Sequence, residues 1–113
     1  MVLGLFGAGG AGRGLYDALS KDQRVQESYE RIVFVDDVVG VAQIDGVDVL
    51  TFDEAIRCYA NDELKFLICL GGPAAREKVY YKIKEKGYSL ATWIHPRAEI
   101  AATVSLGEGN IIY

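Results

Sequence analysis

The sequence predicts an α/β fold in which a parallel sheet carries helices on its faces. Short, almost wholly apolar segments alternate along the chain with segments of helical periodicity, which is typical of strand–helix–strand units. A glycine-rich run follows the first apolar segment directly. The chain has 113 residues, enough for one small core. We therefore expect a Rossmann-like, doubly wound sheet over residues 1–93 and a different, shorter unit over residues 94–113.

Five apolar segments are expected to form the strands. They are short, they contain β-branched or aromatic residues, and turn-forming residues flank most of them. Segment 65–70 is the most strongly apolar, and we expect it to neighbour the first strand where the strand order reverses. The predicted strands are residues 2–6, 31–35, 47–50, 65–70 and 90–94.

Three segments between these strands carry helix signals. Residues 13–21 have the apolar spacing of an amphipathic helix. Thr51 and Glu54 form a capping-box pattern, which predicts a helix that starts there and ends near residue 59. Pro73 is suited to the first position of a third helix, and Gly87 is suited to the position just after its end.

Composition and charge exclude several classes of partner. The formal charge is -4, the isoelectric point is near 4.9 and no basic stripe is present, so we expect no nucleic-acid partner. The first apolar segment is too short to span a membrane and lacks a basic flank, so we expect no membrane partner and a cytoplasmic location. Cys58 and Cys69 lack the spacing of a metal or redox pair, and we expect no metal site.

The glycine-rich run lies between the first predicted strand and the first predicted helix. Residues 7–12 read GAGGAG and match the G-x-G-x-x-G pattern of nucleotide-binding loops. One glycine permits the tight turn, one lets the backbone approach a phosphate, and one lets the helix pack closely on the strand. The positive end of the helix then attracts an anion. We expect a phosphate site here; the alternative is a turn that binds nothing.

Polar residues after the second strand are candidates for the nucleoside. Asp36 ends that strand, where its carboxylate can accept hydrogen bonds from a ribose or a base. Asp37 offers the same chemistry. The alternative for both is that they solvate the end of a strand and start a turn.

Further candidates follow the glycine run and the fourth predicted strand. Arg13 lies in the first helical turn, within reach of a phosphate, although an exposed helix arginine is the alternative. Gly71, Gly72 and Arg76 lie at the crevice where open α/β sheets bind ligands, or they simply shape the loop before Pro73.

His95 is the only histidine of the chain. It has no nucleophile or acid at a recognisable spacing, and it is interpreted as a packing or capping residue. We therefore expect no catalytic residue in this chain.

The last segment has a different period. Ile94, Ile100, Leu106 and Ile112 recur every six residues, with glycines at positions 107 and 109. A six-residue period fits neither a helix nor a flat strand, and it is the period of a hexapeptide β-helix. The alternative is a short strand–turn–strand unit. We expect about one coil, whereas such solenoids need on the order of three repeats to bury their core.

These motifs together resemble the bacterial nucleotide-sugar acyltransferases of the sialic-acid and bacillosamine acetyltransferase type. The motifs are the glycine run, the FVDD end of the second strand, the LGGP sequence with Arg76, and the IHPRA sequence before the six-residue repeats. The resemblance spans the whole chain in the same order.

The resemblance implies an enzyme of two parts. Its Rossmann-like N-terminal domain binds a nucleotide-linked amino sugar, often with UDP, and its left-handed β-helix forms a homotrimer and binds acetyl-CoA. It implies that the glycine run contacts the phosphates, that the aspartates line the nucleoside pocket, and that Gly71 and Arg76 line the opposite side. The candidate substrate-binding residues are thus Gly7, Gly9, Gly10, Ala11, Gly12, Arg13, Asp36, Asp37, Gly71, Gly72 and Arg76.

The chain departs from the family pattern at two points. The family commonly has histidine where this chain has Ala11, which removes one polar contact. The family's catalytic histidine lies inside the β-helix, beyond the last residue, Tyr113. We therefore expect the nucleotide-sugar-binding half of a sugar N-acetyltransferase, with no cofactor in this chain and no activity by itself.

Two other functions use the same residues. The first is a small NAD-binding or redox-sensing module, in which Asp36 holds the ribose 2′-hydroxyl. The second is a scaffold that keeps the fold and binds nothing, for which Ala11 is the main support. A titration with nucleotides and NAD distinguishes these alternatives.

Overall fold

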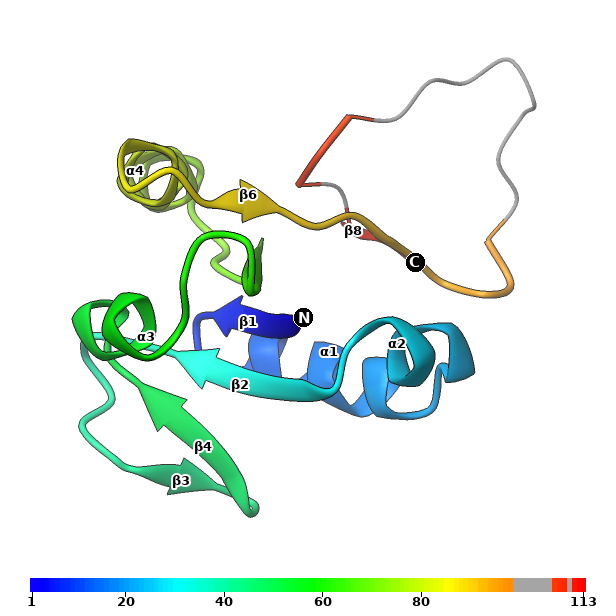
Figure 1. Ribbon diagram of the computed structural model, residues 1–113. Helices are drawn as coiled ribbons and strands as arrows, with labels where there is room; N and C mark the ends of the chain where they lie inside the picture. Colours follow the sequence, from blue (N-terminus) through cyan, green and yellow to red (C-terminus); the bar gives the residue numbers. More distant parts are fainter. Residues whose placement is uncertain (99–106, 110) are drawn as a thin grey trace.

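A six-stranded sheet with helices on both faces forms the fold in the computed structural model, which describes residues 1–98, 107–109 and 111–113 (Figure 1). The strand order is β3-β4-β2-β1-β5-β6, and β7 and β8 form a separate two-stranded sheet. The elements are β1 (Val2–Phe6), α1 (Gly10–Ser20), α2 (Gln23–Ser28), β2 (Arg31–Val35), β3 (Gln43–Ile44), β4 (Val47–Leu50), α3 (Phe52–Cys58), β5 (Leu64–Ile68), α4 (Pro73–Glu85), β6 (Ser89–Leu90), β7 (Trp93–Ile94) and β8 (Ile111–Ile112).

Strand β1 lies at the centre of the sheet, where the strand order reverses. It pairs in parallel with β2 on one side, with Val2 opposite Arg31, and with β5 on the other, with Val2 opposite Leu64. The predicted α/β class and the place of the fourth predicted strand beside the first are therefore confirmed. The carboxyl ends of β1, β2 and β5 meet at one edge, the position at which such sheets bind ligands.

Strand β3 pairs antiparallel with β4, and it was not predicted. Asp45 and Gly46 connect the two strands, and both have positive φ angles, 49° and 79°. That geometry matches the two-residue turn that the right-handed twist of a hairpin favours, for which Asp-Gly is a preferred sequence. The hairpin adds one antiparallel edge strand to an otherwise parallel sheet.

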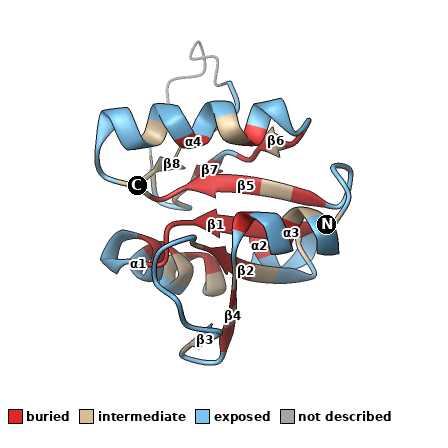
Figure 2. Ribbon diagram, turned by 90° about the vertical axis from the view of Figure 1, so that its left-hand side faces the viewer, coloured by how far each residue is buried: buried red, intermediate tan, exposed pale blue. Residues whose placement is uncertain are grey.

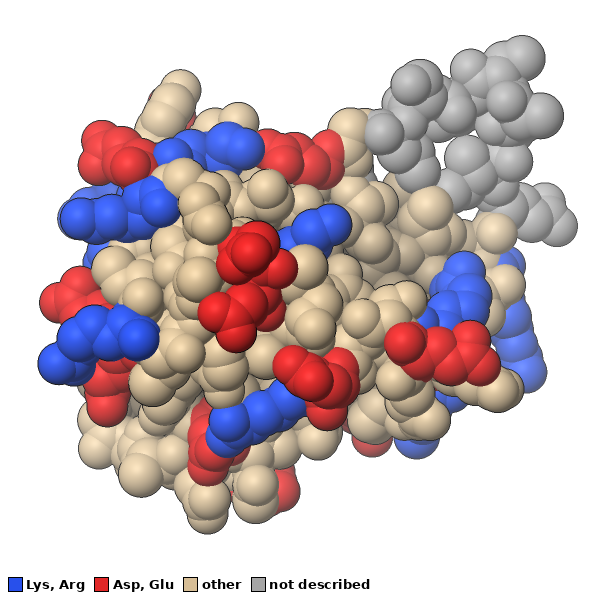
Figure 3. Space-filling view, viewed as in Figure 1, with Lys and Arg blue, Asp and Glu red and all other residues tan. Residues whose placement is uncertain are grey.

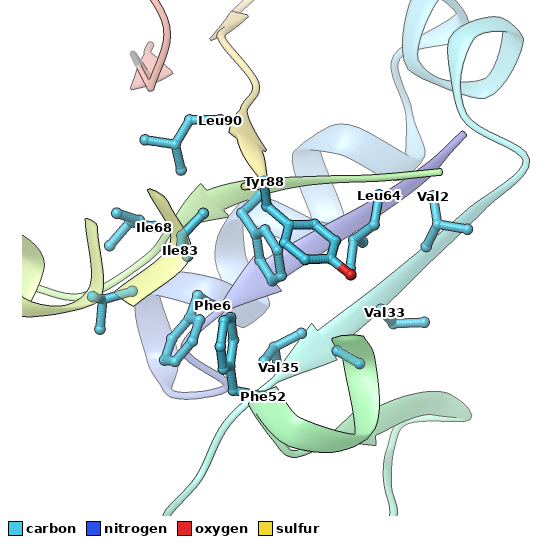
Figure 4. Packing of buried hydrophobic residues seen from close by; sticks show 13 residues of the cluster. Val2, Phe6, Val33, Val35, Phe52, Leu64, Ile68, Ile83, Tyr88 and Leu90 are labelled. Carbon is cyan, nitrogen blue, oxygen red and sulfur yellow. The ribbon is translucent and has the colours of Figure 1, made fainter. Parts of the chain in front are cut away.

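Apolar side chains alternate between the two faces of the sheet. One core lies beneath α3 and α4, and Figure 4 shows its aromatic residues Phe6, Phe52 and Tyr88 together. The ring centroids of Phe6 and Phe52 are 6.0 Å apart, within the usual range for aromatic pairs. The other core lies beneath α1 and α2 and includes Leu5 and Leu15. Figure 2 shows the central strands buried between these layers.

The helix signals are largely confirmed. The Thr51 hydroxyl accepts the Glu54 amide N–H, and the Glu54 carboxylate accepts the Thr51 amide N–H, which completes the predicted capping box. Gly87 follows α4 with a φ of 79°, as its place after the helix end predicts. Helix α1 begins at Gly10, three residues earlier than expected, because the glycine run itself forms the first helical turn.

The predicted strand 90–94 is wrong as a single strand. Ser89 and Leu90 pair with β5, and Trp93 and Ile94 pair with β8 in the second sheet. The chain leaves the main sheet between them because the Trp93 indole and the Ile94 carbonyl form hydrogen bonds with residues of the α2 region, described below.

The spacing of the β7–β8 pair can be compared with the six-residue repeat in the sequence. Trp93 pairs in parallel with Ile111, and Ile94 with Ile112, 18 residues later. One coil of three six-residue repeats returns the chain to such a parallel position. Ile100 and Leu106, the intervening members of the repeat, lie outside the described residues. The β-helix therefore stays a prediction.

Among the described residues, none of the helices has the length and apolar character that crossing a membrane requires. On the face shown in Figure 3, acidic and basic side chains are interspersed.

Candidate functional site

A cavity of about 600 Å³ lies at the carboxyl edge of the sheet. The loops after β1, β2 and β5 contribute to it, and α4 closes one side. Figure 2 shows β1 and β5 pointing toward this edge. Its lining residues are Phe6, Gly7, Gly9, Gly10, Ala11, Asp36, Asp37, Val38, Cys69, Leu70, Gly71, Ala75, Lys78, Val79 and Lys82.

The glycines of the loop fall into two groups. Gly7 has a φ of 118°, and a Cβ at Gly12 would lie 1.9 Å from the Gly7 carbonyl oxygen, so both are required by the turn and by the close approach of α1. At Gly9 and Gly10, by contrast, a Cβ would meet no atom within 4 Å. The open side of these two glycines leaves room for a ligand to approach the backbone at the start of α1.

The Asp36 carboxylate connects the loops of the site. One oxygen accepts the Ala8 amide N–H at 2.9 Å, and the other accepts the amides of Val38 and Val39 at 2.8 and 2.9 Å. Burial opposes ionisation of Asp36, but these hydrogen bonds outweigh it and hold the pKa below its usual value. Asp36 thus fixes the glycine loop relative to the loop after β2. A direct contact between Asp36 and a ligand stays a prediction.

Asp37 spans the cavity toward α4. Its carboxylate accepts the Phe52 amide N–H at 2.8 Å and forms an ion pair with the Lys82 ammonium, also at 2.8 Å. Burial raises the pKa of Asp37, but Lys82 and the Phe52 amide lower it more. The Lys82 nitrogen also lies 5.0 Å from the centre of the Phe52 ring, within cation–π distance.

The structure brings together most of the predicted site residues. Seven line the large cavity, namely Gly7, Gly9, Gly10, Ala11, Asp36, Asp37 and Gly71, whereas Gly12, Arg13, Gly72 and Arg76 do not.

The residues outside the cavity have other partners or positions. Gly12 packs against the loop. The Arg13 side chain is exposed and donates to the Gly9 carbonyl. Gly72 is the N-cap residue of α4. Arg76 donates to the carbonyls of Ile68 and Leu70 and lines a neighbouring cavity instead. Whether any of these residues contacts a ligand stays a prediction.

Two lysines of the site were missed from the sequence. Lys78 and Lys82 line the cavity from α4, where a spacing of four places them on one face. The spacing of four residues between them was the available signal in the sequence. Val38 also lines the cavity, although its side chain is 91% exposed, so an apolar group projects at the cavity mouth.

Neither Cys69 nor His95 presents a reactive nucleophile to the cavity. Burial raises the pKa of the Cys69 thiol to about 12, so this side chain is protonated and a poor nucleophile near neutral pH. His95 accepts the Arg97 amide N–H through Nδ1, packs edge-on against Trp93 and does not line the cavity. The described residues include no group of three or more His, Cys, Asp or Glu placed to hold a metal.

The comparisons with known proteins identify the domain. The sequence profile of the PglD N-terminal domain matches residues 3–83. The chain belongs to the PglD N-terminal domain family. The recognised resemblance to nucleotide-sugar acetyltransferases is therefore confirmed. No curated protein matches this PglD N-terminal domain in sequence.

Solved acetyltransferases share its fold. The acetyltransferase domain of PglB from Neisseria gonorrhoeae, in complex with acetyl coenzyme A, superimposes with a TM-score of 0.77 at 22% identity over 97% of this chain and 51% of that one. A variant of perosamine N-acetyltransferase from Caulobacter crescentus, in complex with CoA and GDP-perosamine, superimposes with a TM-score of 0.77 at 26% identity. The match covers 99% of this chain and 51% of that one. The chain thus spans about half the length of these proteins.

Proposed function

We propose that this PglD N-terminal domain binds a nucleotide-linked amino sugar, as the substrate-holding part of a sugar N-acetyltransferase. The observation that carries the proposal is the cavity of about 600 Å³ beside the glycine loop, with Gly9 and Gly10 open on their ligand side. Its volume falls in the range of small-molecule sites. The family to which the chain belongs points in the same direction.

The phosphates are expected at the start of α1. Backbone N–H groups there have no partner within the helix, and the helix dipole adds a partial positive charge. Lys78 adds a cationic side chain on the opposite side of the cavity, where Lys82 is paired with Asp37. A diphosphate between these elements would be attracted from both sides, and the nucleoside would then lie toward Asp36, Asp37 and the apolar side chain of Val38.

The acyl-transfer step belongs to the proposal for the whole enzyme. The amine of the sugar attacks the thioester carbonyl carbon of acetyl-CoA, an amide bond forms, the C–S bond breaks, and CoA leaves as the thiol after proton transfer. The family resemblance assigns the general base, the acetyl-CoA site and the trimer contacts to a left-handed β-helix. The parallel return of β8 beside β7 supports one coil of such a helix after residue 94. This domain contributes by holding the sugar in place.

The nucleotide is proposed to be of the UDP type, as in many enzymes that the sequence resembles. GDP is the principal alternative, because the Caulobacter crescentus relative was solved with GDP-perosamine. Both nucleotides present a diphosphate to the same loop, so the glycine positions serve either one.

Isothermal titration calorimetry of the 113-residue chain tests the proposal with UDP, UDP-N-acetylglucosamine, GDP, CMP and NAD. We expect a nucleoside diphosphate or its sugar to bind most tightly. Gly9→Ala should weaken that binding by about tenfold, because the added methyl group occupies the space through which a phosphate approaches the backbone. Gly14→Ala is the matched control, since a Cβ there also meets no atom within 4 Å but lies outside the cavity.

Two results would contradict the proposal. Tighter binding of NAD than of every nucleoside diphosphate would favour the dinucleotide-binding module. No binding of any of the five ligands by a folded chain would favour the scaffold.

A further inference from the structure

Asp22 is the one charged residue that is buried in the described part of the chain, with 4% of its surface exposed. It is the N-cap residue of α2, and its carboxylate accepts the Arg24 amide N–H at 3.0 Å. The Arg24 guanidinium also donates to both carboxylate oxygens, at 3.1 and 2.8 Å. These hydrogen bonds compensate the burial of the charge. They do not explain why a charged group is placed at this point of the core.

Asp22 and Arg24 also form hydrogen bonds with residues far along the sequence, and these indicate what the buried pair does. The Trp93 indole N–H donates to the Asp22 carboxylate at 2.9 Å, and the Arg24 guanidinium donates to the Ile94 carbonyl at 2.7 Å. Trp93 and Ile94 form β7, the strand at which the chain has left the main sheet. The two interactions therefore fix β7 against the corner between α1 and α2.

Strand β7 in turn holds β8. Trp93 pairs with Ile111, and the Tyr113 ring packs edge-on against the Trp93 ring with centroids 5.5 Å apart. Ile111 packs against the core beneath α1 and α2. Backbone pairing with Trp93 therefore holds Ile111, and contact with the Trp93 ring holds Tyr113. The hydrogen bond from the Trp93 indole to Asp22 fixes that ring and the start of the strand.

Ile111 and Tyr113 line a second cavity, of about 260 Å³. Ala11 and Gly71 line both this cavity and the proposed nucleotide cavity, so the two lie next to each other. Arg76 also lines the second cavity and holds the loop after β5 through its carbonyls. Figure 2 places the C-terminus near the edge toward which β1 and β5 point.

We infer that Asp22 and Trp93 are positioning residues for the ligand site: their hydrogen bond sets β8 as one side of the second cavity, which accepts the sugar beyond the diphosphate. The inference rests on the proposed function. Neither residue touches the ligand; Asp22 acts through Trp93, and Trp93 acts through Ile111 and Tyr113. The nucleotide and its phosphates lie on the other side of Ala11 and Gly71, and their binding is independent of this hydrogen bond.

The variant Trp93→Phe removes the indole N–H and keeps an aromatic ring. Asp22 keeps its hydrogen bonds to Arg24, so no buried charge is left without a partner. Tyr88→Phe is the matched control. Tyr88 is also a buried aromatic residue whose side chain donates to backbone carbonyls, those of Ile56 and Tyr59, but it lies in the other core.

The test compares the affinities of the 113-residue chain for UDP and UDP-N-acetylglucosamine, or for GDP and GDP-mannose if guanosine is preferred. We expect Trp93→Phe to weaken binding of the nucleotide sugar by about fivefold. The affinity for the nucleotide alone should stay within about twofold of the wild-type value. Tyr88→Phe should change neither the affinity for the nucleotide sugar nor that for the nucleotide. In the wild-type chain, the Ile111 methyl resonances should shift with the nucleotide sugar and not with the nucleotide alone.

Several results would overturn the inference. Equal losses for both ligands in Trp93→Phe would show a general structural effect. An unchanged affinity for the sugar ligand, or an Ile111 signal that does not respond to it, would show that β8 does not contact the sugar. Each of these leaves the nucleotide site in place, whereas failure of every nucleotide to bind would remove the proposed function together with the inference.

Discussion

Replacement of Gly12 by alanine tests the close packing on which the geometry of the glycine loop depends. A Cβ at this position would lie 1.9 Å from the Gly7 carbonyl oxygen and 3.0 Å from its carbonyl carbon. Both atoms belong to the backbone, which cannot rotate away as a side chain can. The first turn of α1 would have to move by about 1.5 Å from the loop to reach an ordinary contact of 3.4 Å.

The cost follows from two opposing terms. Overpacking a rigid site costs roughly 1–3 kcal/mol and sometimes more, and a backbone contact this short belongs at the upper end. Alanine in place of glycine within a helix returns up to about 1 kcal/mol through its higher helix propensity. We therefore expect Gly12→Ala to lower the free energy of unfolding by about 2 kcal/mol or more.

Urea unfolding followed by circular dichroism measures the effect, with Gly14→Ala as the control in the same helix. A Cβ at Gly14 would meet no atom within 4 Å, so this variant should be more stable than the wild type, by about 0.5–1 kcal/mol. A Gly12→Ala variant as stable as the wild type, with an unchanged slope m, would refute the close approach of α1 to the loop.

Other predictions concern the core and the caps. Hydrogen bonds to Arg24 are the main cause of the lowered pKa of Asp22. The ionised carboxylate therefore stabilises the fold above its ordinary pKa, and this stabilisation is lost as the pH falls through the lower pKa of the folded state. Below about pH 4, acid titration should destabilise the wild type more than Asp22→Asn, and parallel curves of stability against pH would contradict this. Thr51→Ala removes the capping box and should cost about 1 kcal/mol in urea unfolding, whereas a loss below the error of the measurement would show that α3 needs no cap. Cys58 is exposed and Cys69 buried, so Ellman's reagent should react with one thiol in the native chain and with two in urea; rapid reaction of both under native conditions would show that Cys69 is accessible.

Much of the fold was predictable because its signals are local. The strand–glycine–helix unit at residues 2–20 combines an apolar run, closely spaced glycines and a helical period within a short stretch. The capping box of α3 and the proline start of α4 are likewise set by neighbouring residues. Such signals predict the folded structure well because the residues that interact are only a few positions apart in the sequence.

The features that were missed depend on distant partners. Helix α2 has six residues and only Val25 buried, so it has no apolar period, and its N-cap Asp22 is also bound by Trp93. The break between β6 and β7 depends on the same contact. Beside the site, the Arg76 guanidinium donates to the backbone carbonyls of Ile68 and Leu70, and no pattern in the sequence predicts such a contact.

The central claim is that the loop at Gly9 and Gly10 holds the phosphates of a nucleotide sugar. The most direct test is an amide NMR titration of the ¹⁵N-labelled chain, which is 12.4 kDa in mass, with UDP-N-acetylglucosamine and with GDP-mannose. We predict that one of these ligands shifts the amide signals of Gly9, Gly10 and Ala11 and leaves the β3–β4 hairpin unchanged. Saturable binding with these three amide signals unmoved would contradict the account.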